Sequence, residues 1–210
     1  MDTRQLTVNN VPVALTPNPR AQSVTISVWS RCGSRDETNQ RQHGLVHFLE
    51  HMVFKGTAEK GATDIARAIE RVGGDLDAFT TRDHTCFIAK VPVDQVALGM
   101  ELLTDILMHP AFREADIERE KQVVLEEIRM SKDDPDDSGD ECFMGRVYPE
   151  TELGRSILGE TETVKGHTRQ SLEAMRKTCF HPENLVVSVA GRFEPDEMKN
   201  RIASFLDHAP

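Results

Sequence analysis

The sequence lacks the features that mark membrane and nucleic-acid-binding proteins. It has no uninterrupted apolar run long enough to cross a bilayer, and its first residues, MDTRQLTVNN, resemble neither a secretory signal nor a transit peptide. Basic residues are in the minority, because 25 Lys and Arg stand against 35 Asp and Glu, a formal net charge of -10. Such an acidic chain repels phosphate backbones and anionic lipids. We therefore expect no nucleic-acid partner, no membrane association and a soluble, cytoplasmic protein of bacterial type, whose surface suits basic or unfolded peptides.

Paired cysteines and nucleotide-binding loops are also missing. The four cysteines, Cys32, Cys86, Cys142 and Cys179, form no CxxC pair, so we expect ordinary buried thiols and not a disulfide or a thiolate zinc knuckle. The glycines give neither GxGxxG nor a phosphate loop. No repeat or long linker interrupts the 210 residues, of which 38% are hydrophobic. This length and composition predict a single domain spanning residues 1–210.

Sheet and helix patterns are interleaved along the chain without strict alternation. Alternating or β-branched segments predict strands at 6–15 (two pieces around an Asn-Asn turn), 24–29, 76–81, 85–91 and from 184. Helical periodicity predicts helices around residue 50 and at 64–72, 93–108, 114–131, 171–180 and from 195. The acidic run 133–137 is expected to be a turn, with a short helix beginning near Ser138. The pattern predicts an α+β fold with a mixed, largely antiparallel sheet covered by helices.

Two histidines and a glutamate stand within about one helical turn of the segment GLVHFLEHMVFKG, residues 44–56. Because residues three and four apart share a helix face, His47, Glu50 and His51 project in the same direction. Two imidazoles at this spacing can aim ring nitrogens at one point roughly 2.0–2.1 Å away, the usual geometry for zinc. Glu50 can then reach a water on that ion without being a ligand. The HxxEH order is the inverse of the HExxH helix of other zinc peptidases.

The apolar setting of this motif favours a metal site over a chance match. A histidine pair on a helix is often only a surface feature, and any short motif carries a risk of chance occurrence. Here the segment is apolar nearly all round, through Val46, Phe48, Leu49, Met52, Val53 and Phe54. A largely buried helix keeps three ionisable groups on one face only when something neutralises them. We therefore predict a metal site on this helix.

A third ligand must come from elsewhere in the chain, because a catalytic zinc ion usually has three protein ligands and one open position. Chemistry alone leaves seven candidates: Glu118, Glu120, Glu126 and Glu127 on the long acidic helix, Asp75 and Asp77 at the start of a strand, and His84 in a turn. For any one of those glutamates, a solvated helix face is the favoured interpretation on chemistry alone. The histidines outside the motif are expected at the surface or in caps: His43, His84, His109, His167, His181 and His208.

Beyond the motif, the chain resembles a known family over nearly its whole length. The matching segments, in the family's order, are HFLEHMVFKGT, RAIERVGGDLDAFTTRDHT, IEREKQVVLEEI, YPETELGRSILG and HPENLVVSVAG. On these residues the chain is similar to the pitrilysin, insulin-degrading enzyme and mitochondrial processing peptidase family of zinc peptidases. The resemblance implies the α+β domain of that family and a zinc-dependent metalloendopeptidase that hydrolyses peptide bonds.

The same resemblance implies a role for each residue of the site. His47 and His51 would bind one zinc ion per chain, and Glu50 would be the catalytic base. The third ligand would be Glu127, the second Glu of VLEEI. Glu120 matches a further family glutamate that supports the site. Since Glu120 lies two turns before Glu127 on the same helix face, it could hydrogen-bond a ligand histidine.

Substrate is expected to bind as an added strand along an exposed sheet edge, because edge pairing holds extended peptides irrespective of their sequence. The candidate edge is the strand predicted at 76–81. Its substrate-binding residues would be Leu76, Asp77, Ala78, Phe79 and Thr80.

The length of the chain matches only one of the several homologous domains from which family members build a chamber. We therefore expect the N-terminal zinc domain alone, with the substrate-holding partner domain absent. It could be a fragment, a one-domain member that forms a homodimer or one subunit of a heterodimer, and it could be inactive in isolation. The alternative is a non-catalytic zinc-binding assembly subunit, as the family's inactive subunits suggest. Those relatives usually have a spoiled motif, so the intact motif favours an enzyme.

Overall fold

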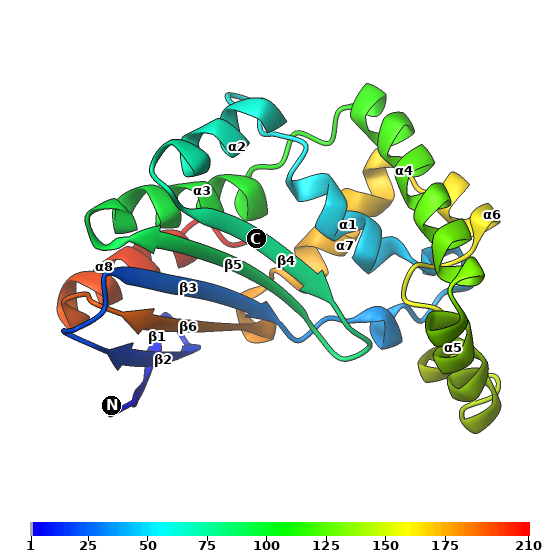
Figure 1. The fold of residues 1–210 in the computed structure, drawn as a ribbon, viewed down its shortest axis with the longest axis horizontal. Helices are drawn as coiled ribbons and strands as arrows, with labels where there is room; N and C mark the ends of the chain where they lie inside the picture. The colour runs from blue at the N-terminus through cyan, green and yellow to red at the C-terminus, as the bar shows by residue number, and fades with distance from the viewer. Residues whose placement is uncertain (1) are drawn as a thin grey trace.

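The computed structural model describes residues 2–210 and is organised around a six-stranded sheet in the order β1-β2-β6-β3-β5-β4 (Figure 1). The strands are β1 (Arg4–Val8), β2 (Val11–Pro17), β3 (Ser23–Ser30), β4 (Asp75–Thr80), β5 (Thr85–Pro92) and β6 (Leu185–Gly191). The β2–β6 pair is parallel, and the other neighbouring pairs are antiparallel. The predicted mixed, largely antiparallel sheet is therefore confirmed. One edge of the sheet is β1 and the other is β4.

Helices cover one face of this sheet and extend beyond its end. They are α1 (Leu45–Val53), α2 (Ala62–Arg71), α3 (Val96–Met108), α4 (Glu114–Asp133), α5 (Pro135–Val147), α6 (Thr161–Lys165), α7 (Arg169–Cys179) and α8 (Pro195–Leu206). Helix α3 packs on β5 and β3, and α1 packs on β4 and on α7. In Figure 1, α4 and α5 form an arm beyond the end of the sheet. This arrangement places α1 between the β4 edge and α4.

Side-chain alternation explains which face of the sheet is covered. In β3, Val24, Ile26 and Val28 are at most 1% exposed, and Thr25 and Trp29 point to the other, partly open face. A period of two is what a strand with one buried face requires. Strands β5 and β6 repeat the pattern, so their inward side chains join those of β3 in one continuous core with the helices.

Two helix predictions differ from the structure. Helix α5 begins at Pro135, three residues earlier than expected, because the Asp134 side chain accepts the backbone N–H groups of Asp136 and Asp137 as an N-cap. The expected acidic turn is therefore the start of a helix, where Pro at the first position and acidic residues are favourable. Helix α6 was not predicted, since five residues are too few for a periodic pattern.

The prediction of unpaired cysteines is wrong for two of the four. Cys32, just after β3, is joined by a disulfide to Cys179 at the end of α7, with Cα atoms 5.2 Å apart. Cys86 is a free buried thiol as expected, whereas Cys142 is free but exposed. The bonded pair is 147 positions apart in sequence, so its proximity arises only from the packing of α7 beside the sheet.

No helix in the part of the chain that the structure describes is both long and apolar enough to cross a membrane.

Candidate metal centre

Helix α1 carries the HxxEH motif through the interior of the molecule. Its residues Phe48 and Met52 are fully buried in the core. His47 is only 7% exposed, whereas Glu50 and His51 are partly exposed on the same side of the helix. The helical spacing of 47, 50 and 51 turns these three side chains away from the core, toward α4 and β4.

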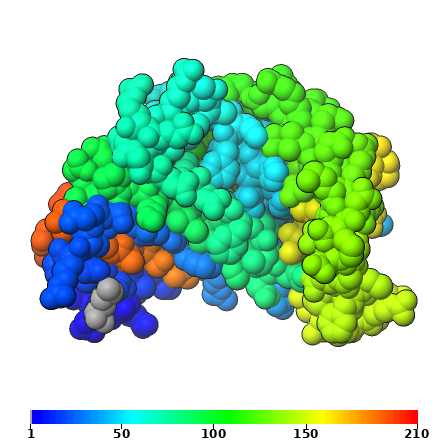
Figure 2. All heavy atoms as spheres, in the orientation of Figure 1, coloured from blue at the N-terminus to red at the C-terminus, as the bar shows by residue number. Residues whose placement is uncertain are grey.

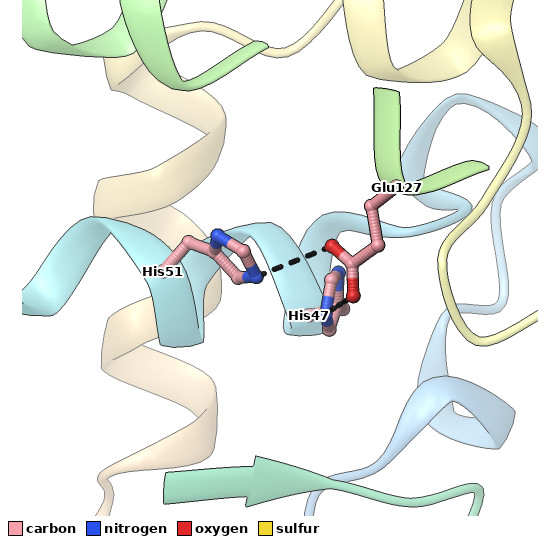
Figure 3. A group of neighbouring side chains, drawn as sticks. All are labelled: His47, His51 and Glu127. Atoms are coloured by element: carbon pink, nitrogen blue, oxygen red, sulfur yellow. Dashed lines mark ion pairs between the residues drawn. The ribbon is translucent and has the colours of Figure 1, made fainter. Parts of the chain in front are cut away.

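Helix α4 brings Glu127 to the two histidines (Figure 3). His47 Nε2 lies 3.7 Å from Glu127 Oε1, and His51 Nε2 lies 3.5 Å from Glu127 Oε2. One ligand atom from each of the three side chains lies within 4.8 Å of the other two. This is the only such cluster of three or more potential ligands within residues 2–210. The structure thus brings together the ligands that the resemblance implied.

The three side chains fit a zinc ion because the Nε2 atoms of both histidines face Glu127 and because two buried polar atoms of the cluster lack partners. Neither His47 Nδ1 nor Glu127 Oε2, both buried, has a hydrogen-bond partner among the described residues. Burial, with the neighbouring His51, lowers the pKa of His47 to about 3, so its imidazole is neutral, as a metal ligand must be. Two imidazoles and one carboxylate form a typical donor set of a catalytic zinc site with an open fourth position.

Glu120 holds the second histidine from behind. His51 Nδ1 lies 2.8 Å from Glu120 Oε1, and Lys55 Nζ lies 2.7 Å from Glu120 Oε2. Burial acts to raise the pKa of Glu120, but hydrogen bonds from His51 and Lys55 leave it below its usual value. An ionised carboxylate here accepts a hydrogen bond from His51 Nδ1–H and leaves Nε2 free to face Glu127.

Glu50 lies beside the cluster and is held by strand β4. The hydroxyl of Thr80 donates a hydrogen bond of 2.6 Å to Glu50 Oε2. Burial raises the pKa of Glu50, and the bond from Thr80 opposes that rise. A carboxylate with one oxygen held and a raised pKa is suited to accept a proton through its other oxygen.

The cluster opens into a cleft of about 560 Å³ between β4 and the α4–α5 arm. Figure 2 shows the surface of α1 exposed between that of β4 and that of α4. His47, Glu50 and Glu127 lie in its wall. Further acidic residues from the arm line it as well: Asp134, Asp137, Asp140 and Glu141. The only Lys or Arg side chain lining it is Arg82, so the cleft is strongly acidic.

The predicted substrate strand is an edge strand, but its residues differ in how they face the cleft. Phe79 and Thr80 line the cleft, whereas Leu76, Asp77 and Ala78 lie further along β4. Thr81 N–H donates to His84 O in a bond of 2.8 Å, so residues 79 and 77 pair with β5 in the same way. The alternate residues 76, 78 and 80 then direct their backbone groups away from the sheet. The Ala78 N–H donates instead to Asp77 Oδ1 at 2.8 Å.

The other candidates for a third ligand lie outside the cluster. Glu126 is exposed and forms an ion pair with Arg129, and Glu118 forms one with Lys121. The ring of His84 packs against those of Trp29 and Phe79, with centroids 5.3 and 5.9 Å away, and takes no part in the cluster. Spacing alone could not distinguish Glu118 and Glu126 from Glu127, because all three lie on one long acidic helix.

Sequence reasoning missed several residues around the site. Lys55, which holds Glu120, was not singled out. Thr80 was expected to bind substrate, but its hydrogen bond to Glu50 was not foreseen, because nothing in the motif itself indicates it. His43 and His167 are buried, at 7% and 1% exposed, so the expectation of a surface position is wrong for both, although His43 is the C-cap residue of the short helix Gln40–Gln42. His181 does cap a helical turn, as its side chain accepts the Glu183 N–H. The burial of the other two follows from tertiary packing that local sequence does not reveal.

Comparison with known proteins gives consistent results. The model of the insulinase family, peptidase family M16, matches residues 12–161. A protein named an uncharacterized zinc protease of Mycobacterium leprae is 40% identical over 180 residues, which cover 86% of this chain and 40% of that protein. The uncharacterized zinc protease YmxG of Bacillus subtilis is 39% identical over 192 residues, 91% of this chain and 47% of that protein. The chain therefore spans less than half the length of these two relatives.

A solved structure has the same fold. A chain described as an inactive M16 peptidase domain of Pseudomonas fluorescens superimposes with a TM-score of 0.93 at 17% identity, covering 100% of this chain and 51% of that one. At this identity the likeness shows the fold alone. The match covers about half of that chain, so the matched unit is there part of a chain about twice as long.

Proposed function

Because the chain belongs to the insulinase family, peptidase family M16, we propose that it is the zinc-bearing domain of a metalloendopeptidase that hydrolyses short or unfolded peptides. The observation that carries this proposal is the convergence of His47 and His51 on α1 with Glu127 on α4. These three residues would hold one zinc ion per chain. When bound, the ion polarises the peptide carbonyl and lowers the pKa of a water toward about 7.

Glu50 is the proposed base. It accepts a proton from the attacking water and returns it to the nitrogen of the departing amine, so one carboxylate serves both steps. Thr80 holds Oε2, which leaves Oε1 to exchange protons in the cleft. Partial burial of the carboxylate keeps its pKa above the ordinary value, which makes it a stronger base.

Two features of the cleft support an extended peptide as substrate. The outward backbone groups of β4 at residues 76, 78 and 80 offer an edge to which a peptide strand can add. To pair with Ala78 N–H, the substrate carbonyl would displace the Asp77 side chain. The acidic wall formed by α5 favours lysine or arginine side chains in the bound peptide.

Full activity is proposed to need a homologous partner. The chain spans 40% and 47% of two zinc-protease relatives and about half of a solved M16 chain. The cleft is open on the side away from α1, so a second domain or subunit would enclose the peptide and exclude water from the site.

A non-catalytic zinc-binding assembly subunit is the second candidate. One structural neighbour is described as an inactive domain, although its likeness to this chain at 17% identity shows the fold and not a role. The presence of His47, Glu50, His51 and Glu127 together argues against such a subunit, because a purely structural role needs no base beside the ligands.

The deciding experiment measures metal content and hydrolysis together. The purified chain is analysed for zinc and then assayed with a quenched fluorogenic peptide containing arginine, with and without a chelator. A peptidase is expected to contain about one zinc per chain and to show hydrolysis that the chelator abolishes and added zinc restores. Zinc without hydrolysis, in the chain alone and with its partner half, would favour the assembly subunit. Absence of zinc binding would overturn both readings.

A further inference from the structure

The metal-bearing helix α1 starts without a side-chain cap of its own. Its N-cap residue is Gly44, whose φ of 80° lies in the left-handed region. A Cβ atom at this position would lie 2.4 Å from the carbonyl oxygen of Leu158 and 2.8 Å from the Cα of Gly159. The serine, threonine or aspartate that usually satisfies the first amides of a helix therefore cannot occupy this position.

Glu37 supplies the missing cap from seven residues earlier in the chain. Its Oε2 accepts the Gly44 N–H at 2.9 Å, and its Oε1 accepts the Val46 N–H at 2.7 Å. Glu37 follows the short helix Ser34–Asp36 and is only 2% exposed. Burying a carboxyl group is costly unless its hydrogen bonds are satisfied, so such a group is retained where it fixes a structure.

The two ligand histidines depend differently on this cap. The ring of His51 is held from behind by Glu120 at 2.8 Å. The Nδ1 atom of His47 has no hydrogen-bond partner among residues 2–210, so no neighbouring side chain fixes its ring in this way. The position of the His47 ring therefore depends on the packing around it and on the backbone of the first turn of α1. Val46, whose N–H is bound by Glu37, directly precedes His47 in that turn.

We propose that Glu37 is the positioning residue for His47: by binding the Gly44 and Val46 amides, its carboxyl group fixes the first turn of α1 and so places the His47 ring opposite Glu127. This inference rests on the proposed function in so far as His47 binds zinc. Its structural half, that Glu37 holds the first turn of α1, stands without it. Glu120 would then orient His51 by contacting its ring, and Glu37 would orient His47 by holding the backbone beside it.

The test uses Glu37→Ala and the nearly isosteric Glu37→Gln, with two measurements. The first is amide hydrogen exchange of residues 44–47 in the metal-free protein. We expect exchange about tenfold faster in Glu37→Ala, because the first turn opens when its acceptor is removed. Glu37→Gln should be intermediate, since its side chain keeps one acceptor oxygen and turns an NH2 group toward the other amide.

The second measurement is the zinc dissociation constant, obtained by competition with a chromophoric chelator. We expect zinc binding to weaken by about tenfold or more in Glu37→Ala, as for other residues that orient a ligand. The matched control is Asp64→Asn, because Asp64 accepts the Gly61 N–H at 3.0 Å at the start of α2, away from the metal site. The control should leave both zinc affinity and exchange at 44–47 as in the parent.

The outcomes separate this inference from the proposed function. If the parent binds no zinc, the proposed function fails, and hydrogen exchange alone still decides whether Glu37 holds the first turn. If the parent binds zinc and Glu37→Ala matches it in affinity, Glu37 is not a positioning residue. If Glu37→Ala does not fold, as judged by circular dichroism, the same comparison is made with Glu37→Gln. Unchanged exchange and affinity in that variant would overturn the proposal.

Discussion

At the scale of single residues, the two glutamates of the site differ in the groups that they contact. Glu50 is bound by a hydroxyl and faces the cleft, whereas Glu127 faces two imidazoles. Glu50→Gln should therefore retain zinc and lower kcat/KM by about 100-fold or more, because an amide cannot accept the proton. The measurements are zinc content and hydrolysis of the fluorogenic peptide.

The matched control for Glu50 is Glu127→Gln. This variant should lose affinity for zinc as well as activity, because the charged ligand is replaced by a neutral one. Activity in Glu127→Gln should recover in part at high zinc concentration, whereas that of Glu50→Gln should not. If Glu50→Gln cleaves the peptide at the parent rate, Glu50 is not the base.

His167 gives a pH dependence of stability that is separate from the metal site. It is buried beside Phe48, and burial together with the charge of Lys121 lowers its pKa to about 4. The unfolded chain, with a pKa near 6.5, binds this proton first, so folded-state stability is lost as the pH falls from 6.5 to 4. The loss from this residue is on the order of 3 kcal/mol.

Replacing His167 with leucine should remove that part of the acid sensitivity. Urea unfolding of the metal-free protein at several pH values should give a shallower decline below pH 6.5 for His167→Leu than for the parent. His208→Leu, a change at an exposed histidine, is the control and should follow the parent. Equal slopes for all three proteins would show that His167 is not buried in its neutral form.

The sequence predicts the site unevenly at this scale. The spacing of His47, Glu50 and His51 places them on one face from local geometry alone. The choice of Glu127 among the glutamates of α4 needed the family resemblance, because each of them fits the chemistry. Glu37 was not foreseen, since its role depends on a turn of chain that returns its carboxyl group to the start of α1.

At the scale of elements, the free edge of β4 is the feature on which the proposed substrate binding depends. The register with β5 directs the N–H of Ala78 away from the sheet. Ala78→Pro removes this donor without removing a bond to β5, and proline is tolerated on edge strands. We expect KM to rise several-fold with zinc content unchanged, since only the pairing with an extended peptide is impaired.

The control for this change is Ala78→Ser, which keeps the N–H group and adds only a small side chain. It should bind peptide as the parent does. An unchanged KM in Ala78→Pro would mean that substrate does not pair with β4 at this position, and the edge-binding proposal would then be wrong.

Most elements could be predicted from local patterns, whereas one misinterpreted cap and the long-range strand order could not. All six strands were expected from alternation or β-branched runs, and the helix around residue 50 from helical periodicity. The start of α5 was misplaced because a capping aspartate followed by proline was interpreted as a turn. The insertion of β6 between β2 and β3 could not be predicted, because it pairs residues near 187 with residues near 13 and 28.

At the scale of the whole molecule, the Cys32–Cys179 disulfide ties the start of the chain to its last third. It links a residue after β3 to the end of α7, which packs against α1. Closing so long a loop restricts the unfolded chain, so Cys32→Ser should lower the free energy of unfolding by about 2–4 kcal/mol. Unfolding in urea, with and without reductant, measures the effect.

Cys86→Ser is the comparison for that experiment, because Cys86 is a free buried thiol. The stability of Cys86→Ser should still fall when reductant is added. The stability of Cys32→Ser should not change with reductant. If reductant leaves the parent unchanged, the two sulfurs are not bonded in solution.

The open side of the cleft is proposed to be enclosed by a partner, either a second copy of this chain or a separate homologous half. If a second copy of this chain serves as the partner, hydrolysis per chain should rise with protein concentration, since dimer formation follows mass action. Adding an excess of the Glu50→Gln chain should then activate the parent, because the variant retains its fold and can be the partner without being the catalyst. An equal amount of an unrelated acidic protein is the control.

A separate homologous half gives the opposite result. In that case the isolated chain stays weakly active at every concentration, the Glu50→Gln chain does not stimulate it, and activity returns only on co-expression with the half that completes the relatives' length. Full activity in dilute solution, independent of concentration, would instead show that the site on α1, α4 and β4 needs no partner. The mixing experiment therefore distinguishes a homodimer, a two-part enzyme and a self-sufficient domain by the rate per parent chain alone.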